Sequence, residues 1–508
     1  MKKILVLLLA AVMLFSVFAC TKNEDKKPAD TTSPVTTPGA TTEPTTEVIT
    51  TTEDPNSPYI DDITFEGADF RIAAREMYLV EEVFIEEVTT EPRALSIWER
   101  NAAVQDKYDV KITPVKSYDT TVGGHAKELV DFIMADEDVY DIGLTFAISS
   151  EQFVTKGLTI NWNSLDYTDF TKDYWIESVN ENLIIDDAIY TPVGDMCTTA
   201  LTWTYAVFYN RTKGDQMYLD AEQTVTVTEE VFEKIDAGEW TIDYFMSLIG
   251  DMYQDLDSTI GRSEGDFYGF TAWTGNDVDM FPYAFNIPII SPDPDVVLKF
   301  TLGSEKGSTA VDKINQLYWQ TNGSYCTDHP ADTVQVHPLK FVRGEALFTT
   351  SWMRQCFELF ADMDDQYSIL PYPMFDENQD KYRTSAADRY SVITIPKTCK
   401  NLDMVSIVTE ALNYESQKRV FPVYYEESLQ KKYTHDIESI EMLDIIMDGR
   451  TFDISTILMY EISWEFRHAI TAQRRDFKTY CDRQAAWKAT VIGRVVEEYR
   501  NNKNLGIA

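Results

Sequence analysis

The order of strand-like and helix-like segments after residue 58 constrains this chain most strongly. Residues 70–73, 110–113 and 139–144 are short runs rich in apolar and β-branched side chains, which is typical of strands. Between them, apolar residues recur at helical spacing in two segments: Ile97, Val104 and Tyr108, then Leu129, Phe132 and Ile133. This alternation predicts a parallel sheet covered by helices, with a ligand beyond the carboxyl ends of the strands.

A second α/β region is predicted from about residue 204, with strands at residues 205–210, 267–270, 346–349, 368–370 and 390–396. Helices are predicted after Thr241 and Asn401, and over the tail from about residue 455 to residue 504. A further helix is predicted where four apolar side chains repeat at helical spacing: Met353, Cys356, Phe357 and Phe360. The roughly 450 residues after the N-terminal stretch exceed one ordinary core, so we expect two lobes or more.

The N-terminus has the order of a secretory signal: Lys2 and Lys3, an apolar run over residues 4–18, then Ala19 and Cys20. The run is shorter than a membrane span requires. Residues 17–20 resemble a bacterial lipobox, in which Cys20 becomes the acylated N-terminus, although Phe18 stands where that pattern has a small residue. We expect residues 1–20 to be a lipoprotein signal peptide; secretion without a lipid is the alternative that Phe18 leaves open.

Residues 21–58 consist almost wholly of Thr, Pro, Glu, Asp, Lys and Ala, a composition that predicts a disordered, extended tether. The whole chain carries a formal charge of −40. Such a charge repels phosphate backbones and anionic lipid surfaces. We therefore expect no nucleic-acid partner, and contact with a membrane through the lipid anchor only.

The sequence offers little for metal or catalytic chemistry. Besides Cys20, five scattered cysteines remain, without the spacing of a disulfide framework or a zinc site. Residues 255–266 resemble a calcium loop, but Ile260 replaces its turn glycine and Asp266 is shorter than its usual Glu, so we expect a structural loop. Nucleophile-elbow, zinc-protease and nucleotide-binding motifs are missing from a usable context. We predict no enzyme, no cofactor and no metal.

A set of short motifs carries a family resemblance over nearly all of the chain after residue 58. In order and spacing it resembles the extracellular solute-binding protein family 1 of carbohydrate ABC importers. The matching segments are residues 99–101 with 107–110, 190–195, 238–241, 266–270, 341–348, 369–373, 395–398 and 441–446. The resemblance implies a two-lobed periplasmic-binding-protein-like α/β fold of type II, each lobe a mostly parallel sheet flanked by helices, with the ligand cleft between the lobes.

The resemblance also implies boundaries and a function. Lobe one would comprise residues 59–200 plus 388–430, and lobe two residues 201–387 plus 431–508. The protein would capture a carbohydrate and deliver it to the transmembrane subunits of an ABC importer by hinge closure of the lobes. The aromatic-rich loops favour an oligosaccharide. We expect a monomer at the extracellular face of the cytoplasmic membrane.

Sugar recognition needs aromatic faces for the C–H side of a pyranose, and polar groups for its hydroxyls. By the resemblance, Trp352 at a strand end is a stacking residue, with core packing as the alternative. Trp273 follows the strand over residues 267–270, and Asn276 and Asp277 are its candidate hydroxyl partners. Phe146, just after the strand at residues 139–144, is the candidate stacking face of lobe one.

Four more candidates lie where the resemblance places the chain's crossings between lobes. They are Asp195 and Trp203 at the first crossing, and Arg389 and Tyr390 at the second. For Arg389 an ion pair with Asp388 that fixes the hinge is the alternative to ligand contact. Two other functions also fit these features: a secreted carbohydrate-active enzyme, and a surface lipoprotein that senses sugar.

Overall fold

The computed structural model describes residues 54–119, 121–327, 336–430 and 437–503, and the chain from Asp54 onward forms one compact unit. Cys20 and the signal and lipobox around it lie outside the described residues. Within the described ranges, no helix combines the length and the apolar character that a membrane crossing needs. Asp54 is the first described residue, and its carboxylate accepts a hydrogen bond from the Tyr414 hydroxyl at 2.7 Å.

The first sheet has four strands in the order β12-β3-β1-β2. They are β1 (Ala68–Arg75), β2 (Val110–Ser117), β3 (Ile142–Phe146) and β12 (Ser391–Thr394). β1 runs parallel to both β2 and β3, which confirms the predicted strand–helix alternation, and β12 adds an antiparallel edge to β3. β3 begins at Ile142 and continues through Phe146, so Phe146 is the last residue of this strand and does not follow it.

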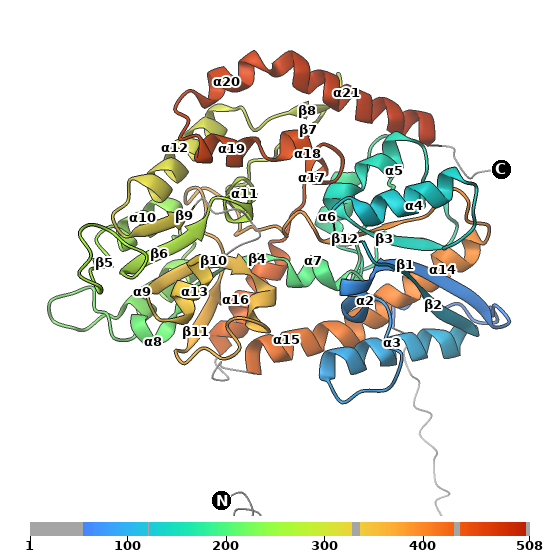
Figure 1. Ribbon diagram of the computed structural model, residues 1–508, viewed down its shortest axis with the longest axis horizontal. Helices are drawn as coiled ribbons and strands as arrows, with labels where there is room; N and C mark the ends of the chain where they lie inside the picture. Colours follow the sequence, from blue (N-terminus) through green and yellow to red (C-terminus); the bar gives the residue numbers. More distant parts are fainter. Residues whose placement is uncertain (1–53, 120, 328–335, 431–436, 504–508) are drawn as a thin grey trace, which may run out of the picture. The chain divides into compact units, whose positions relative to one another are not determined.

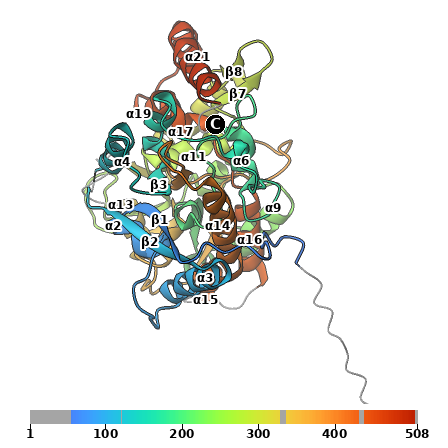
Figure 2. The same cartoon turned by 90° about the vertical axis from the view of Figure 1, so that its right-hand side faces the viewer.

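Helices cover both faces of this sheet. Figures 1 and 2 show α3 (Pro92–Tyr108) and α14 (Leu402–Glu415) on one face and α4 (Gly124–Met134) on the other. α3 begins where Glu91 caps the Ala94 amide, and its apolar residues Ile97, Val104 and Tyr108 are buried as predicted. Other helical segments linked to these elements are α2 (Glu76–Glu82), η1 (Ala147–Ser149), α5 (Glu151–Thr155), η2 (Trp162–Ser164), α6 (Glu177–Leu183), α7 (Thr198–Thr202), η4 (Ser416–Val420) and α15 (Phe421–Gln430).

The second sheet has the order β11-β4-β10-β6-β5, with β9 also paired to β6. Its strands are β4 (Tyr205–Asn210), β5 (Tyr253–Gln254), β6 (Phe267–Trp273), β9 (Ser324–Thr327), β10 (Ala346–Trp352) and β11 (Tyr367–Leu370). β6 is parallel to β9 and β10, whereas β4 is antiparallel to β10 and β11. This sheet is therefore mixed, where we expected a mostly parallel one. The chain enters it at Tyr205, opposite the end of β10 at Trp352, so β4 must run the other way.

The helices linked to the second sheet are α8 (Arg211–Gly214), α9 (Val227–Asp236), α10 (Ile242–Ile249), α11 (Asn276–Ala284), α12 (Glu305–Trp319), α13 (Val336–Val342) and α16 (Ile437–Asp448). Thr241 caps α10 as predicted, because its hydroxyl accepts from the Tyr244 amide. The helix predicted from Met353 to Phe360 is wrong: a short 3-10 turn, η3 (Met353–Cys356), stands there. The apolar residues Met353, Cys356 and Phe360 are still buried, in the core beside β4 and β10, although the helical turn ends at Cys356.

The last described part of the chain is helical, as predicted: α17 (Ile454–Leu458), α18 (Tyr460–Ser463), α19 (Glu465–Thr471), α20 (Phe477–Arg483) and α21 (Ala485–Asn502). α21 packs against the hairpin of β7 (Ile290–Asp293) and β8 (Val297–Phe300), and also against α5, as Figure 1 shows. Tyr499 at its end meets Tyr190 edge to face at 4.7 Å. The lobe boundaries given above stay a prediction.

Candidate functional site

In both large sheets, strands end in aromatic or basic residues at their carboxyl ends. In open α/β sheets, ligands bind outside the carboxyl ends of the strands. β1 ends at Arg75 and β3 at Phe146, while β6 ends at Trp273 and β10 at Trp352. Trp273 is thus part of β6, whereas we expected it in the loop after a shorter strand.

Aromatic rings from both sheets meet at these strand ends. The Trp203 and Trp352 rings are stacked, with centroids 5.4 Å apart and planes 26° apart. Trp203, which directly follows α7, also lies 6.4 Å from Phe146. Tyr78 packs beside Phe146 at 5.5 Å, and Tyr205 packs edge-on against Trp352 at 5.9 Å. We call Tyr78, Phe146, Trp203, Tyr205 and Trp352 the aromatic cluster; it brings together three of the predicted site residues.

The cluster holds polar atoms that the described residues do not satisfy. The indole Nε1 atoms of Trp203 and Trp352 are both buried and have no hydrogen-bond partner among those residues. Buried tryptophan N–H groups usually find an acceptor. The stacked pair therefore has two donors available to a bound molecule or to water.

Sequence reasoning missed Tyr78 and Tyr205 of the cluster, and a basic residue beside it, Arg75. Its guanidinium carbon lies 3.5 Å from the centroid of the Phe146 ring, and the side chain is almost fully buried. Burial lowers the pKa of Arg75 to about 10. The available signal was a charged residue at the end of an otherwise apolar strand, the position where ligand contacts are expected.

Arg389 and Tyr390 have different environments. Arg389 is 40% exposed and faces the Asp388 carboxylate at 4.0 Å, and its positive charge lowers the pKa of Arg75. Tyr390 is buried and packs edge to face on Phe452 at 4.8 Å. Arg389 is therefore near the aromatic cluster and accessible, whereas Tyr390 lies in the core.

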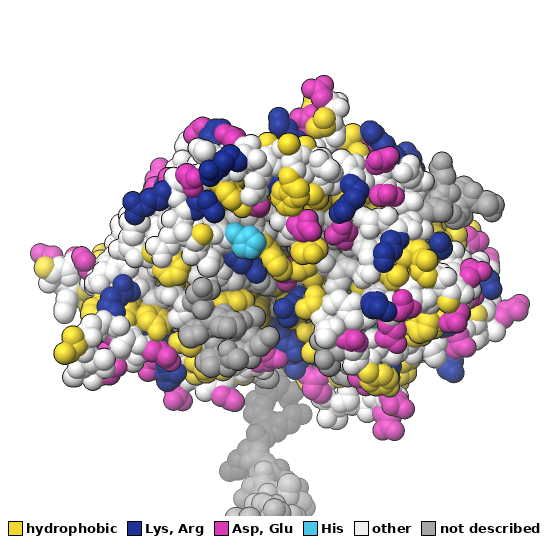
Figure 3. All heavy atoms as spheres, turned by 45° about the horizontal axis from the view of Figure 1, so that its top comes forward, with side chains coloured by type: hydrophobic (Ala, Val, Ile, Leu, Met, Phe, Trp, Pro, Cys, Tyr) yellow, Lys and Arg dark blue, Asp and Glu magenta, His cyan; other side chains and the backbone are white. Residues whose placement is uncertain are grey.

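One face of the molecule has a central hollow, which Figure 3 shows. Dark blue lysine and arginine side chains lie inside this hollow next to yellow hydrophobic ones. These are the same two kinds of side chain that meet at the aromatic cluster.

Among the site residues predicted around Trp273, Asp277 uses its carboxylate for hydrogen bonds within the protein. Asp277 accepts hydrogen bonds from the Thr350 hydroxyl at 2.6 Å and from the Trp273 amide at 3.1 Å. Burial raises the pKa of Asp277 to about 7, although both hydrogen bonds act in the opposite direction. His337 lies 3.4 Å away, and burial keeps it neutral by lowering its pKa to about 3. Asp277 thus fixes the end of β6 against β10.

Asn276 and the Trp273 ring are held from other directions. The Asn276 side-chain oxygen accepts from Arg467 at 2.7 Å, and Arg467 also pairs with Asp279. The Trp273 ring lies directly against Gly275: an added Cβ there would be 2.1 Å from the ring carbon Cζ3. Glycine is therefore required at residue 275 for this position of the indole.

Asp195 lies in a different place from the aromatic cluster. It lines a cavity of about 1020 Å³ whose wall includes Trp175, Tyr425 and Arg450. Burial raises the pKa of Asp195 to about 7, opposed by the charge of Arg450. Because this cavity contains no strand end, we place the candidate site at the aromatic cluster instead.

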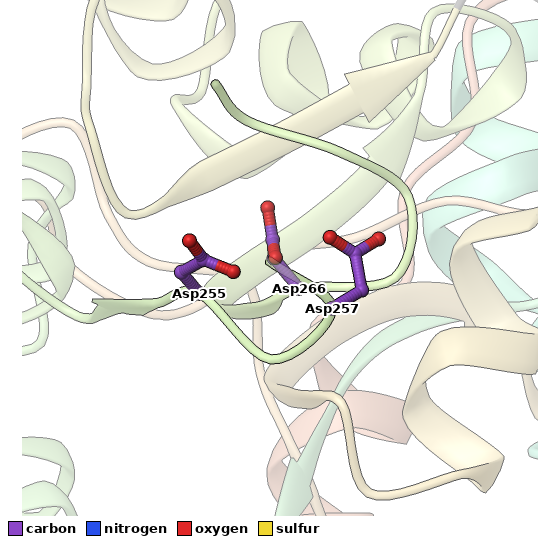
Figure 4. A group of neighbouring side chains, drawn as sticks. All are labelled: Asp255, Asp257 and Asp266. Carbon is purple, nitrogen blue, oxygen red and sulfur yellow. The ribbon is translucent and has the colours of Figure 1, made fainter. Parts of the chain in front are cut away.

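The calcium-like loop brings three carboxylates together, as Figure 4 shows. One oxygen each of Asp255, Asp257 and Asp266 lies within 4.8 Å of the others. Asp266 accepts from the amides of Ser263 and Leu256 and from the Tyr253 hydroxyl. These hydrogen bonds close the loop between β5 and β6.

Comparisons with known proteins concern the fold. No family model matches the chain, and no curated protein matches it. The galacto-N-biose-/lacto-N-biose I-binding protein of the ABC transporter from Bifidobacterium longum, solved with lacto-N-biose, superposes with a TM-score of 0.53 at 10% identity; the match covers 86% of this chain and 98% of that one.

Two further solved structures are less similar. The maltose-binding periplasmic protein from Listeria monocytogenes, solved with maltose, gives a TM-score of 0.49 at 12% identity, covering 86% of this chain and 99% of that one. UgpB from Mycobacterium tuberculosis, solved with glycerophosphocholine, gives 0.46 at 12% identity, covering 86% and 98%. On the Bifidobacterium longum match, this chain has the two-lobed, mixed α/β fold of ABC transporter solute-binding proteins.

Proposed function

We propose that this protein captures a carbohydrate outside the cell and delivers it to an ABC importer. The observation that carries the proposal is the stacked pair of Trp203 and Trp352, in contact with Phe146 at the carboxyl ends of strands from both sheets. Flat aromatic faces suit the C–H face of a pyranose, and the two indole N–H groups suit its oxygens.

The placement of these residues supports capture by closure. A ligand that touches Phe146 in the first sheet and Trp352 in the second stabilises the conformation in which both contacts are made. Several rings in one site favour an oligosaccharide over a monosaccharide. The solute-binding proteins of similar fold include one solved with lacto-N-biose, a disaccharide.

The proposal extends to the cellular setting. Acylation at Cys20 would hold the protein at the outer face of the cytoplasmic membrane, where it meets the transmembrane subunits of the importer as a monomer. The enzyme alternative requires an acid at the site, yet Asp277 is committed to Thr350 and the Trp273 amide. The sensor alternative uses the same sugar site and differs only in the membrane partner.

The test is a calorimetric and thermal-shift screen of residues 54–508 against mono- and oligosaccharides. A bound sugar should raise the melting temperature and remain unconsumed. Trp352→Ala should weaken binding about 10-fold or more, because a ring and its N–H are lost together. Trp487→Ala is the matched control, since Trp487 is an exposed tryptophan on α21.

Each other outcome has a definite meaning. Consumption of the sugar would replace capture with the enzyme alternative. Absence of binding by any sugar would point to another solute class. Pull-down of a membrane kinase, and not of importer subunits, by the sugar-loaded protein would favour the sensor.

A further inference from the structure

The cations of this acidic chain are mostly paired with carboxylates, but Arg75 is not. Most other arginines of the described part face a carboxylate within 4.0 Å, as Arg71 does with Asp141 and Arg467 does with Asp279. Among the described residues, Arg75 has no such partner. Its Nη2 donates to the Thr121 carbonyl at 3.0 Å, while Nε and Nη1 are buried without an acceptor.

Arg100 shows what a purely structural arginine looks like in this protein. It is fully buried, and it donates to the carbonyls of Glu82 and Val83, to Asn101 and to Ser416. Burial of an arginine is acceptable when its donors are used in this way. Arg75 is nearly as buried, yet two of its nitrogen atoms have no acceptor, which is costly unless something else supplies one.

The position of Arg75 indicates where its missing hydrogen-bond acceptor would come from. The guanidinium lies on the Phe146 face, at the strand ends where the aromatic cluster stands. A second cation, Arg389, is close enough for its charge to lower the pKa of Arg75. Asp388 offsets Arg389 at 4.0 Å, and the exposed Asp119 carboxylate accepts from Thr121, so neither carboxylate bonds to Arg75.

Glu82, the other carboxylate whose charge acts on Arg75, is also engaged elsewhere. It accepts from the Thr199 amide at 2.9 Å and from the Ser391 hydroxyl at 2.6 Å. The buried guanidinium is therefore left with free donors beside stacking faces. Nε and Nη1 lie on different edges of the guanidinium, and each has a parallel neighbour in one of the two N–H groups of Nη2, only one of which donates to Thr121. A planar anion, or a tetrahedral one with several oxygens, accepts two parallel hydrogen bonds from one such edge.

We propose that Arg75 binds an acidic group of the carbohydrate, so that the ligand is an anionic sugar: a uronate, or a sugar carrying a phosphate or sulfate ester. This rests on the proposed function, because it concerns the same site. Arg389 adds long-range attraction for the same group from the accessible side. The aromatic cluster binds the ring, and Arg75 selects for the charge.

The first experiment compares ligands on the unaltered protein by calorimetry. The probes are oligogalacturonates, oligoglucuronates and oligomannuronates, each with its methyl ester, together with a 6-phosphorylated and a 6-sulfated hexose. Esterification removes the charge and leaves the ring, so an acid should bind about 10- to 100-fold more tightly than its ester. The phosphate and sulfate probes distinguish these esters from a uronate as the source of the charge.

The second experiment uses variants of Arg75, with Arg500→Gln as a control for an exposed arginine on α21 that is paired with Asp186. Arg75→Gln should weaken binding of the acid about 10- to 100-fold, and should weaken binding of the ester by a clearly smaller factor, because the ester offers Arg75 only a neutral carbonyl oxygen. Its melting temperature without ligand should not fall, because an unsatisfied buried charge is removed. Arg75→Lys keeps the charge without the fork, and should give an intermediate loss.

The outcomes separate this inference from the proposed function. Trp352-dependent binding of neutral sugars, with no preference for acids, would overturn the inference and leave carbohydrate capture in place. Equal affinity of Arg75→Gln and the unaltered protein for the acid would also overturn it. No binding of either neutral or acidic sugars would overturn both. If Arg75→Gln failed to fold, the acid–ester comparison and Arg75→Lys would still decide.

Discussion

Trp203 and Trp352 stack with their ring centroids 5.4 Å apart, although one follows the helix that leads out of the first region and the other ends a strand of the second sheet. Such a pair contributes about 0.5–1.5 kcal/mol beyond the burial of its area. The pair therefore stabilises the approach of the two sheets before a ligand arrives.

This contact predicts a measurable coupling. Trp203→Ala, Trp352→Ala and the double variant form a cycle, and urea unfolding should give an interaction energy of about 0.5–1.5 kcal/mol. Additive effects of the two single variants on the free energy of unfolding would show that the rings do not support each other in solution.

Gly275 should control ligand affinity through Trp273. Gly275→Ala places a methyl group against the ring of Trp273 and must displace it. If Trp273 contacts the sugar, affinity should fall about threefold to tenfold in calorimetry. Gly493→Ala is the matched control: this glycine lies inside α21 with open space around it, so alanine should stabilise the helix by about 0.5–1 kcal/mol without changing affinity. A Gly275→Ala variant that binds normally would remove Trp273 from the site.

Asp277 should make the protein less stable as the pH rises. Its pKa is about 7 in the folded chain and 3.8 as an ordinary aspartate, so its contribution is fully present below about pH 4 and is lost between about pH 4 and pH 7. Asp277→Asn keeps an acceptor for Thr350 and the Trp273 amide. It should reduce the drop in unfolding free energy between pH 4 and pH 8 by up to about 4 kcal/mol.

Asp195, with a pKa also raised to about 7, provides the comparison for that experiment. Asp195→Asn should remove a separate part of the same pH dependence, because the two carboxylates lie in different surroundings. An unchanged pH profile in Asp277→Asn would show that this carboxyl titrates normally in the folded protein.

Removal of the charge should cost much more stability at Arg100 than at Arg75. Arg100→Gln removes the arginine donors of the Glu82 carbonyl and of the Asn101 side-chain oxygen, whereas the Val83 carbonyl keeps the Asn101 amide. The free energy of unfolding should therefore fall by about 3 kcal/mol. Arg75→Gln should change it by less than about 1 kcal/mol. Urea unfolding of both variants without ligand tests this, and a large loss in Arg75→Gln would assign that arginine to the fold.

The sequence alone determined most of the local elements, with the helix expected from Met353 to Phe360 as an exception. The spacing of Ile97, Val104 and Tyr108 predicts a buried helix face, and Thr241 predicts a helix start. Both could be predicted because each signal depends on residues close together in the chain. The sequence also identified Phe146 as a candidate, because an aromatic residue at a strand end is visible without a structure, and the family resemblance added Trp352 and Trp203.

Only the tertiary structure decided which of these candidates meet. It brought Trp203, Trp352 and Phe146 together, turned Asp277 toward Thr350, and placed Asp195 in a separate cavity. It also showed that Arg75 lies on Phe146 with donors unused. Contacts between residues far apart in the chain depend on how whole sheets and helices pack, and periodicity reports only which face of one element is apolar.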